Sequence, residues 1–443
     1  MGELLNSWQA RLDAHPDKAA IVLAETGAVT TFRQLDAWAD AFLEKHPELQ
    51  EGRGRALAFA AASPKEWIGI YLVALKSGMV AMPTESVGAG GFNESQLQAS
   101  GVSFAVADGQ LTRQPDGGIF EGGHLIKFTS GTTGTPVALL FTEAEMAADG
   151  RQIMQTMGVE ASDRNYAMIP LGHSYGLGNL IMPLILAGTE IVMGSAPYPQ
   201  VVADEIHRYQ CTVFPSVPPV LKALAHSDVA AESPGSLKRV ISAGSPLPPE
   251  VAREFLDRYG RRIHNFYGSS ETGGICFDRT GDATLSGAGI GTPLDGVTVE
   301  VDPEGAIFVR SPAVCRSALE TRGCRMNDFG RWNSDGVLQL IGRNADFVKV
   351  AGKRLFLTEV EQVLAGIDGV VDAYVTQRPS RRGEVQIVAL IQGTIPPAEL
   401  KAQLQREMPG WKIPKRIHVV GTIPYTPRGK KDRKALEALV DEQ

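Results

Sequence analysis

The chain has 443 residues, 43% of them hydrophobic and 21% charged, which is typical of soluble globular proteins with two or three folding units. Its 43 basic and 50 acidic side chains give a formal net charge of −7, which argues against a general nucleic-acid binder. The most apolar stretch, at 180–188, is far shorter than the roughly 20 residues of a membrane span, so no membrane segment is expected.

The cysteines and the N-terminus both indicate a cytoplasmic protein. Residues 1–18 are charged and lack the apolar region of a signal peptide. The four cysteines are too widely spaced for a zinc site or a redox pair, so we expect buried, reduced thiols at Cys211, Cys276, Cys315 and Cys324.

Through most of the chain, short apolar runs alternate with helix-like periodicities, which predicts layered α/β structure. The strand-like runs lie at 20–25, 56–62, 167–170, 190–194, 211–216 and 239–244. The helix-like patterns lie at 31–46, 63–78, after His173 and at 201–210. Thr142 followed by Glu145 is a capping box and predicts a helix start.

The last part of the chain has a different texture. Residues 281–342 are rich in Gly and Pro turns and predict a small all-β unit. After Gly342, strands at 370–377, 384–393 and 416–421 combine with helices at 358–367 and 397–408, the first capped by Thr358 and Glu361. We therefore expect an α/β fold: a large N-terminal domain (1–342) of layered α/β subdomains with a small β unit, then a small α+β C-terminal domain (343–443).

The segment FTSGTTGTP, at 128–136, follows a strand-like run and combines glycines with hydroxyl side chains. Such a loop can turn its backbone N–H groups toward a phosphate. It is not a Walker loop, and taken alone it also fits a polar turn.

Three further constellations carry possible chemistry. YGSSETGG at 267–274 offers an aromatic face, a Thr donor and the carboxylate of Glu271, which suits magnesium. Asp328 and Arg343 flank a predicted β-hairpin and could bind ribose hydroxyls. Lys430, in PYTPRGKKDR, could meet an anionic transition state. Taken singly, each of these residues also fits a solvated surface role.

The order and spacing of these four motifs resemble those of the adenylate-forming superfamily, and coverage runs from about residue 18 to residue 437. That superfamily includes acyl- and aryl-CoA ligases, adenylation domains of peptide synthetases, and luciferases. The resemblance implies activation of a carboxylic acid by ATP and magnesium, with a mobile C-terminal domain and CoA or phosphopantetheine as co-substrate.

The resemblance also implies residue roles in nucleotide binding. Glu271 would hold magnesium, Lys430 would bridge the carboxylate and the α-phosphate, and Asp328 and Arg343 would hold the ribose. The phosphates and adenine would be contacted by Thr129, Ser130, Gly131, Thr132, Thr133, Gly134, Gly244, Ser245, Tyr267, Gly268 and Thr272.

The acid and the pantetheine arm would meet a second set of residues. His173, in GHSYGLGN, would gate the acyl pocket, although a packed core histidine is the alternative. By the same resemblance, the remaining pocket and tunnel residues would be Tyr175, Gly176, Ser216, Ser269, Gly273 and Gly352.

Two departures from the family pattern affect the charge near the phosphates and the hinge. Val137 stands where the loop usually carries a lysine, and Lys127, just before the loop, is the other cation to consider. Ala345 stands where a hinge aspartate is often found.

The pocket segment has no carboxylate to pair with an α-ammonium, so an aryl or medium-length acyl acid is expected. The expected partners are thus a small carboxylic acid and CoA. The alternatives are a freestanding enzyme that loads an acyl carrier protein, a non-catalytic nucleotide-binding homologue and, less favoured, a luciferase-type oxygenase.

Overall fold

The structure, a computed structural model, describes the whole chain except residues 1, 62, 85–100, 108, 115–116, 130–136, 231–233, 344–346, 351–352, 380–384, 426–430 and 443, and the side chains of 129, 347, 349, 353 and 354. The chain forms two compact units. The first comprises Met1–Glu300, Phe308–Arg325 and Asn333–Leu338, and the second Val301–Ile307, Met326–Trp332 and Gln339–Gln443. A domain boundary after Gly342 stays a prediction.

A nine-stranded sheet in the order β15-β14-β13-β12-β11-β9-β10-β1-β2 is the largest in the first unit. Strands β1, β10, β9, β11, β12 and β13 run parallel, whereas β2, β14 and β15 pair antiparallel. Its strands are β1 (Ala19–Leu23), β2 (Val29–Thr31), β9 (Arg164–Ala167), β10 (Glu190–Met193), β11 (Val213–Ser216), β12 (Arg239–Ser242), β13 (Ile263–Ser269), β14 (Gly273–Phe277) and β15 (Thr292–Pro293).

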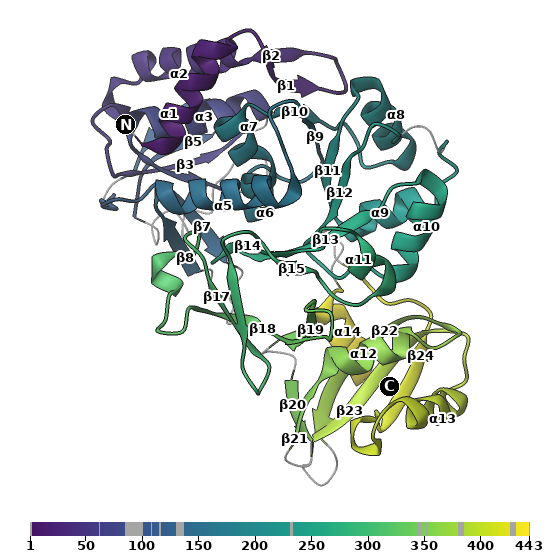
Figure 1. The fold of residues 1–443 in the computed structure, drawn as a ribbon. Helices are drawn as coiled ribbons and strands as arrows, with labels where there is room; N and C mark the ends of the chain where they lie inside the picture. The colour runs from purple at the N-terminus through teal and green to yellow at the C-terminus, as the bar shows by residue number, and fades with distance from the viewer. Residues whose placement is uncertain are drawn as a thin grey trace. The chain divides into compact units, whose positions relative to one another are not determined.

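Helices α8 (Pro199–Tyr209), α9 (Pro218–Ala225) and α10 (Pro249–Tyr259) cover one face of this sheet and follow its strands β9 to β13 along one side (Figure 1). Their apolar residues share a buried cluster with strand residues such as Tyr166, Phe214 and Val240. The alternation of short apolar runs with helix-like patterns predicted this arrangement. The strands are apolar along their length because parallel strands are buried on both faces.

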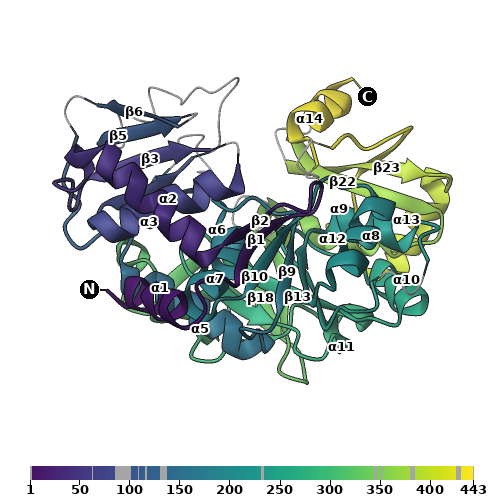
Figure 2. The ribbon, with the colours of Figure 1, turned by 90° about the horizontal axis from the view of Figure 1, so that it is seen from above.

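A six-stranded sheet in the order β6-β5-β3-β4-β7-β8 forms the other α/β layer of the first unit. Its strands are β3 (Ala56–Ala60), β4 (Val80–Pro83), β5 (Val102–Ala107), β6 (Gln110–Arg113), β7 (Leu125–Thr129) and β8 (Val137–Phe141). Figure 2 places α2 (Phe32–Lys45) and α3 (Pro64–Ser77) beside strands β3 and β5.

The largest buried cluster joins the two sheets through helices, including α1 (Glu3–Ala14), α5 (Glu143–Met157) and α7 (Met182–Ala187). Helix α5 begins with the predicted capping box: the Thr142 hydroxyl accepts from the Glu145 N–H, and the Glu145 carboxylate accepts from the Thr142 N–H. Helix α1 was not predicted. Short helical turns lie at η1 (Pro47–Leu49) and η3 (Arg316–Ala318).

A four-stranded sheet in the order β16-β17-β18-β19 confirms a β-rich region before the C-terminal part. It comprises β16 (Thr298–Val301), β17 (Ala306–Arg310), β18 (Cys324–Trp332) and β19 (Leu338–Arg343). The predicted start of this unit at 281 is wrong, because α11 (Asp282–Ser286) is helical and β15 pairs with β14 in the large sheet.

The second unit has the predicted α+β composition, and its three-stranded sheet has the order β22-β23-β24. Its elements are β20 (Phe347–Val350), β21 (Lys353–Phe356), α12 (Leu357–Ala365), β22 (Val370–Pro379), β23 (Val385–Gly393), α13 (Pro397–Glu407), η5 (Gly410–Lys412), β24 (Arg416–Val420) and α14 (Arg433–Asp441). Helix α14, which packs on β22 and β23 near the C-terminus (Figure 2), was not predicted.

The capping box predicted at Thr358 is wrong. Helix α12 begins at Leu357, and its N-cap residue Phe356 has no capping side chain. The Thr358 hydroxyl instead donates to the Ile341 carbonyl, while the Glu361 carboxylate accepts from the Val375 N–H and from Lys431.

All four cysteines are free and buried, as expected, and burial raises the pKa of Cys211 and of Cys324 to about 12. Among the described residues, no helix is both long enough and apolar enough to cross a membrane. The α/β fold with a large N-terminal part and a small α+β C-terminal part is therefore confirmed.

Candidate active site

The glycine and hydroxyl segment lies between two paired strands. β7 and β8 run antiparallel, with Lys127 opposite Leu139 and Thr129 opposite Val137. Val137 is 54% exposed. Thr129 ends β7, but its side chain, and the predicted phosphate contacts Ser130, Gly131, Thr132, Thr133 and Gly134, lie outside the described residues. Their roles stay predictions.

A tight turn joins β13 to β14 and carries the second motif. Ser269 pairs with Gly273 across the turn, and the Ser269 hydroxyl accepts from the N–H groups of Glu271, at 3.2 Å, and Thr272, at 3.3 Å. Thr272 is fully buried, and its hydroxyl lies 3.1 Å from the Ser269 hydroxyl. The turn is thus built from its own hydroxyl groups, and it leaves Glu271 half-buried at its tip.

Two glycines of this turn are required by space. Gly273 has a φ of +69°, and a Cβ atom on Gly268 would lie 2.6 Å from the Gly273 carbonyl oxygen. Both positions therefore exclude side chains. Tyr267, the aromatic residue predicted near adenine, is 8% exposed in β13.

The predicted acid-binding segment forms a short, irregular helix. His173 is the N-cap of α6 (Ser174–Gly176), and its Nδ1 accepts from the Tyr175 N–H at 3.3 Å. A π-helical turn, η2 (Leu177–Ile181), follows and leads into α7. His173 is exposed, so the alternative of a packed core histidine is wrong. A π-turn often marks a functional position in a helix.

Tyr175 connects this segment to the carboxyl ends of the central strands. Its hydroxyl donates to the carbonyls of Ser216, at 3.3 Å, and Ile241, at 3.4 Å, and its ring lies 5.9 Å from that of Phe266. Burial raises the pKa of this phenol, which keeps it a donor. A Cβ atom on Gly176 would lie 2.0 Å from the Pro170 carbonyl oxygen, so Gly176 allows the close approach.

The segments also meet at two pairs of serines. The Ser174 and Ser270 hydroxyls lie 3.4 Å apart, which joins the acid segment to the Glu271 turn.

Ser216 and Ser242 lie opposite each other at the ends of parallel strands β11 and β12, with 1% and 2% exposure. Neither of these two buried hydroxyls has a hydrogen-bond partner within the described part of the chain. Ligands of open parallel sheets bind at such an edge.

The predicted adenine loop follows β12. Gly244 has a φ of +89° and is exposed, and Ser245 is half-buried. The structure therefore brings together, at one edge of the nine-stranded sheet, the residues predicted from 173–176, 216, 242–245 and 267–273. The individual roles predicted for these residues stay predictions.

In the second unit, Asp328 and Arg343 meet across β18 and β19. The Arg343 guanidinium donates from Nε to Asp328 Oδ1 at 2.8 Å, with Asp328 buried and the Arg343 side chain 64% exposed. The two residues predicted at the ribose are thus neighbours. Lys430, Gly352 and Ala345 lie outside the described residues.

The neighbouring Lys431 interacts with other residues of the second unit. Its ammonium forms ion pairs with Glu361 and Asp372, each at 3.2 Å, and contacts the Ala373 carbonyl. Burial raises the pKa of Glu361, and the charge of Lys431 opposes that rise. These partners account for Lys431 as part of the fold of the second unit.

A buried charge pair beneath the Glu271 turn was not predicted as part of the site. Lys127 and Asp149 are 5% and 3% exposed. Burial lowers the pKa of Lys127 and raises that of Asp149, and each charge opposes the shift of the other. A lysine inside the apolar run HLIKF is the one signal in the sequence that could have indicated such a pair.

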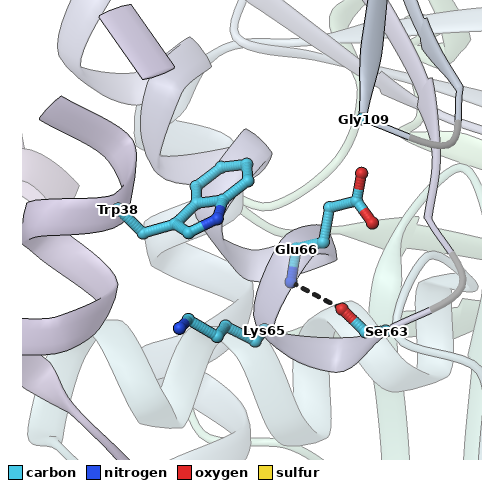
Figure 3. A pocket seen from close by; sticks show the side chains of 5 residues that line it. All are labelled: Trp38, Ser63, Lys65, Glu66 and Gly109. Carbon is cyan, nitrogen blue, oxygen red and sulfur yellow. Dashed lines mark hydrogen bonds between the residues drawn. The ribbon is translucent and has the colours of Figure 1, made fainter. Parts of the chain in front are cut away.

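Surface hollows lie away from these motifs. One, of about 330 Å³, lies at the start of α3 and is lined by Trp38, Ser63, Lys65, Glu66 and Gly109 (Figure 3). Another, of about 240 Å³, is lined by basic residues of the opposite strand ends, including Lys238, Arg239 and Arg262. Neither contains a predicted site residue.

Glu271 was the predicted magnesium ligand. Among the described residues, no group of three or more His, Cys, Asp or Glu side chains could hold a metal ion. A single half-buried carboxylate nevertheless fits magnesium that arrives with a nucleotide, because Mg²⁺ is commonly held by one or two carboxylates together with phosphate oxygens and waters.

Comparison with known families finds two matches along the chain. Residues 124–317 match the AMP-binding enzyme family, and residues 359–430 match the AMP-binding enzyme C-terminal domain. Together these matches cover more than half of the chain.

Individual proteins are similar at lower identity. The chain is 29% identical to a 2-hydroxy-7-methoxy-5-methyl-1-naphthoate–CoA ligase of Streptomyces carzinostaticus, over 71% of this chain and 62% of that protein. It is 26% identical to the probable non-canonical nonribosomal peptide synthetase CymA of Salinispora arenicola, over 98% of this chain but 6% of that protein. The chain therefore spans less than two thirds of both relatives.

The fold is shared with solved structures. ATP-bound MatB from Rhodopseudomonas palustris superposes with a TM-score of 0.84 at 20% identity, over 99% of each chain. At this identity, the likeness concerns the fold alone.

Proposed function

Because the chain belongs to the AMP-binding, adenylate-forming superfamily, we propose that it activates a carboxylic acid with ATP and transfers the acyl group to the thiol of CoA. The observation that carries this proposal is the meeting of three segments at one edge of the parallel sheet. Tyr175 contacts the ends of β11 and β12, and Ser174 contacts Ser270 beside the Glu271 turn. An acid and a nucleotide bound there would be neighbours.

The first half-reaction joins the acid to AMP. A carboxylate oxygen attacks the α-phosphorus of ATP, the bond to the β-phosphate oxygen breaks, and pyrophosphate leaves. Thr272, Tyr267 and the loop before Val137 hold the nucleotide, and Lys430 offsets charge on the α-phosphate during attack. Glu271 would hold magnesium together with the phosphates, and the metal would supply electrostatic stabilisation of the same charge.

The second half-reaction releases AMP. The thiolate of the acceptor attacks the acyl carbonyl, and the bond to the AMP oxygen breaks. In this proposal the C-terminal domain rotates between the steps, withdrawing Lys430 and presenting Gly352 along the pantetheine arm. Asp328 and Arg343, which contact each other in the second unit, hold the ribose.

The acid is proposed to be an aryl or medium-length acyl acid without an α-amine. The pocket segment 173–179 contains no carboxylate that could pair with an ammonium group. Asp149 lies close to Gly178, but its carboxylate already accepts from the Gly274 N–H, and the charge of Lys127 acts on it. The unpartnered Ser216 and Ser242 hydroxyls suit a polar group on the acid. The similar ligase of Streptomyces carzinostaticus carries an aromatic acid in its name.

Loading of a carrier protein is the second candidate for the acceptor. It is favoured by the similarity of almost the whole chain to a short part of a peptide synthetase. Free CoA and a carrier-bound phosphopantetheine arm offer the same thiol, so the two candidates share the first half-reaction.

Acid-dependent exchange of labelled pyrophosphate into ATP, measured over a panel of aryl, acyl and amino acids, tests the first half-reaction. We expect exchange with aryl or acyl acids and none with amino acids. Thioester formation is then measured with CoA and with a phosphopantetheinylated carrier protein, each supplied alone. Brisk exchange with amino acids alone would contradict the proposed acid, and thioester with the carrier alone would replace CoA as acceptor.

A further inference from the structure

Asp149 lies where the acid segment and the Glu271 turn approach each other. Its Oδ1 accepts from the Gly274 N–H at 2.9 Å, and a Cβ atom on Gly273 would lie 2.2 Å from the same oxygen. On the other side, a Cβ atom on Gly178 would lie 3.0 Å from Oδ2. The carboxylate of α5 is therefore held between two glycines, one from the π-turn η2 and one from the turn that carries Glu271.

The charge of Asp149 is opposed from the neighbouring sheet. Lys127 projects from β7, and its ammonium lies 4.2 Å from the centre of the Phe141 ring. Within the described part of the chain, no hydrogen bond or ion pair ends on this ammonium. Burial lowers the pKa of Lys127, and the negative charges of Asp149 and Glu271 oppose that shift.

Buried opposite charges contribute little net stability to a fold. Desolvation of two charges is costly, and apolar residues of similar volume often stabilise a fold at least as well. A buried carboxylate that accepts a backbone N–H does, however, fix the position of that backbone. The two glycines match this function, because they let both segments reach the carboxylate.

We propose that Asp149, charge-balanced by Lys127, is a positioning residue for adenylation that fixes the Glu271 turn against the π-turn of the acid segment. This inference rests on the proposed function, since it assigns the pair to the geometry of the first half-reaction. Asp149 hydrogen-bonds to the backbone of the turn, so we assign it a positioning role and not a catalytic one. Its effect reaches the reaction through Gly274, three residues beyond Glu271.

A second Asp–Lys pair in the first unit provides a matched control. Asp163 is 2% exposed and accepts from Lys238 at 3.0 Å, the Thr212 hydroxyl at 2.8 Å and the Glu160 N–H at 2.9 Å. It precedes β9 at the opposite strand ends, and among the described residues its hydrogen bonds reach no predicted site residue. Removing this pair takes away a buried carboxylate and its lysine without touching the turn.

The test compares Lys127→Met/Asp149→Ala with Lys238→Met/Asp163→Ala, at a temperature where near-UV circular dichroism shows both folded. Pyrophosphate exchange gives kcat and KM, and hydrogen exchange of the 266–277 peptide reports the Gly274 N–H. We expect the first variant to lose about 10²-fold in kcat, with a smaller change in KM for ATP, because a shift of about 1 Å has such an effect. Its Gly274 amide should exchange faster, and the control should keep wild-type kcat and amide protection.

One further variant guards against a purely structural loss. Lys127→Met/Asp149→Asn keeps an acceptor for Gly274, so it should recover most of the lost kcat.

Wild-type kcat with a protected Gly274 amide in Lys127→Met/Asp149→Ala would overturn the inference, as would equal loss in the control. If the wild-type protein shows no exchange with any acid, the proposed function fails, and the amide measurement still tests the positioning.

Discussion

Two buried aspartates in the same unit, each associated with a lysine, have opposite surroundings. Asp163 is surrounded by donors, and its lysine, Lys238, has a 60% exposed side chain. Among the described residues, Asp149 accepts one hydrogen bond, from the Gly274 N–H, and Lys127, whose charge acts on it, is itself buried. The first arrangement is that of a capped strand connection, and we infer that the second constrains the turn that carries Glu271. Residue type alone does not distinguish them, whereas the surrounding donors do.

The largest expected difference between the pairs is in stability. Asp149→Leu leaves Lys127 as a buried cation without its counter-charge, which should lower the free energy of unfolding by about 3–5 kcal/mol. Asp163→Leu leaves Lys238 in water and removes hydrogen bonds, for a loss of about 1–3 kcal/mol. Urea denaturation at constant m-value measures both. Equal losses would remove the distinction between the two pairs.

The next effect concerns the carboxylate that the constrained turn carries. Glu271→Gln should reduce adenylation by about 10²–10³-fold, because the charge proposed to hold magnesium is lost. Its stability should stay within about 0.5 kcal/mol of wild type, since Glu271 is half-exposed. Pyrophosphate exchange over a magnesium titration gives the result. A variant with wild-type exchange at low magnesium would remove Glu271 from the metal site.

A smaller effect is expected from adding a surface cation near the buried one. Val137 is 54% exposed, so Val137→Lys should fold normally and strengthen phosphate contact by about 1.5–3 kcal/mol at most. ATP affinity by calorimetry and the exchange rate report the gain. If neither changes, another cation already occupies that role, and Lys127 is the residue to test next.

The smallest effect is the pH dependence of stability. Burial would raise the pKa of Asp163, but hydrogen bonds from Glu160, Lys238 and Thr212 outweigh it and hold the pKa below its usual value. Its stabilisation is thus present above the unfolded pKa of about 3.9 and is lost as pH falls through the folded pKa. The advantage of wild type over Asp163→Asn should shrink on acidification.

Asp149 has the opposite shift, so the advantage of wild type over Asp149→Asn should grow as pH falls. Thermal unfolding between pH 6 and pH 3 gives both differences. If the stability advantage of wild type changed in the same direction with pH for both variants, the opposite pKa shifts of Asp149 and Asp163 would be contradicted.

Local patterns in the sequence predicted an element well where all of the interacting residues lie within that element. The capping box at Thr142 formed because both of its residues are available to the helix end. At Thr358 the same pattern failed, because Ile341 and Val375, from other elements, take the hydroxyl and the carboxylate. Tertiary partners of this kind cannot be read from local spacing.

The residues of the candidate site also differ in whether the sequence alone could identify them. Its motif residues were found from their types and order, and the structure brings those from 173–176, 216, 242–245 and 267–273 to one edge. Asp149 was missed because its partner Gly274 is 125 residues away, and its own segment reads as an ordinary amphipathic helix. The two glycines that make room for it acquire meaning only once they are placed in space.

In the proposed first half-reaction, a carboxylate oxygen of the acid becomes bonded to the phosphorus of AMP. Isotope transfer tests this bond most directly: the protein is given ATP, magnesium, CoA and an acid labelled with ¹⁸O in both carboxylate oxygens, and the products are measured by mass spectrometry. We expect AMP that carries one ¹⁸O atom and a thioester that keeps the other. Label in inorganic phosphate, or AMP without label while thioester forms, would contradict it.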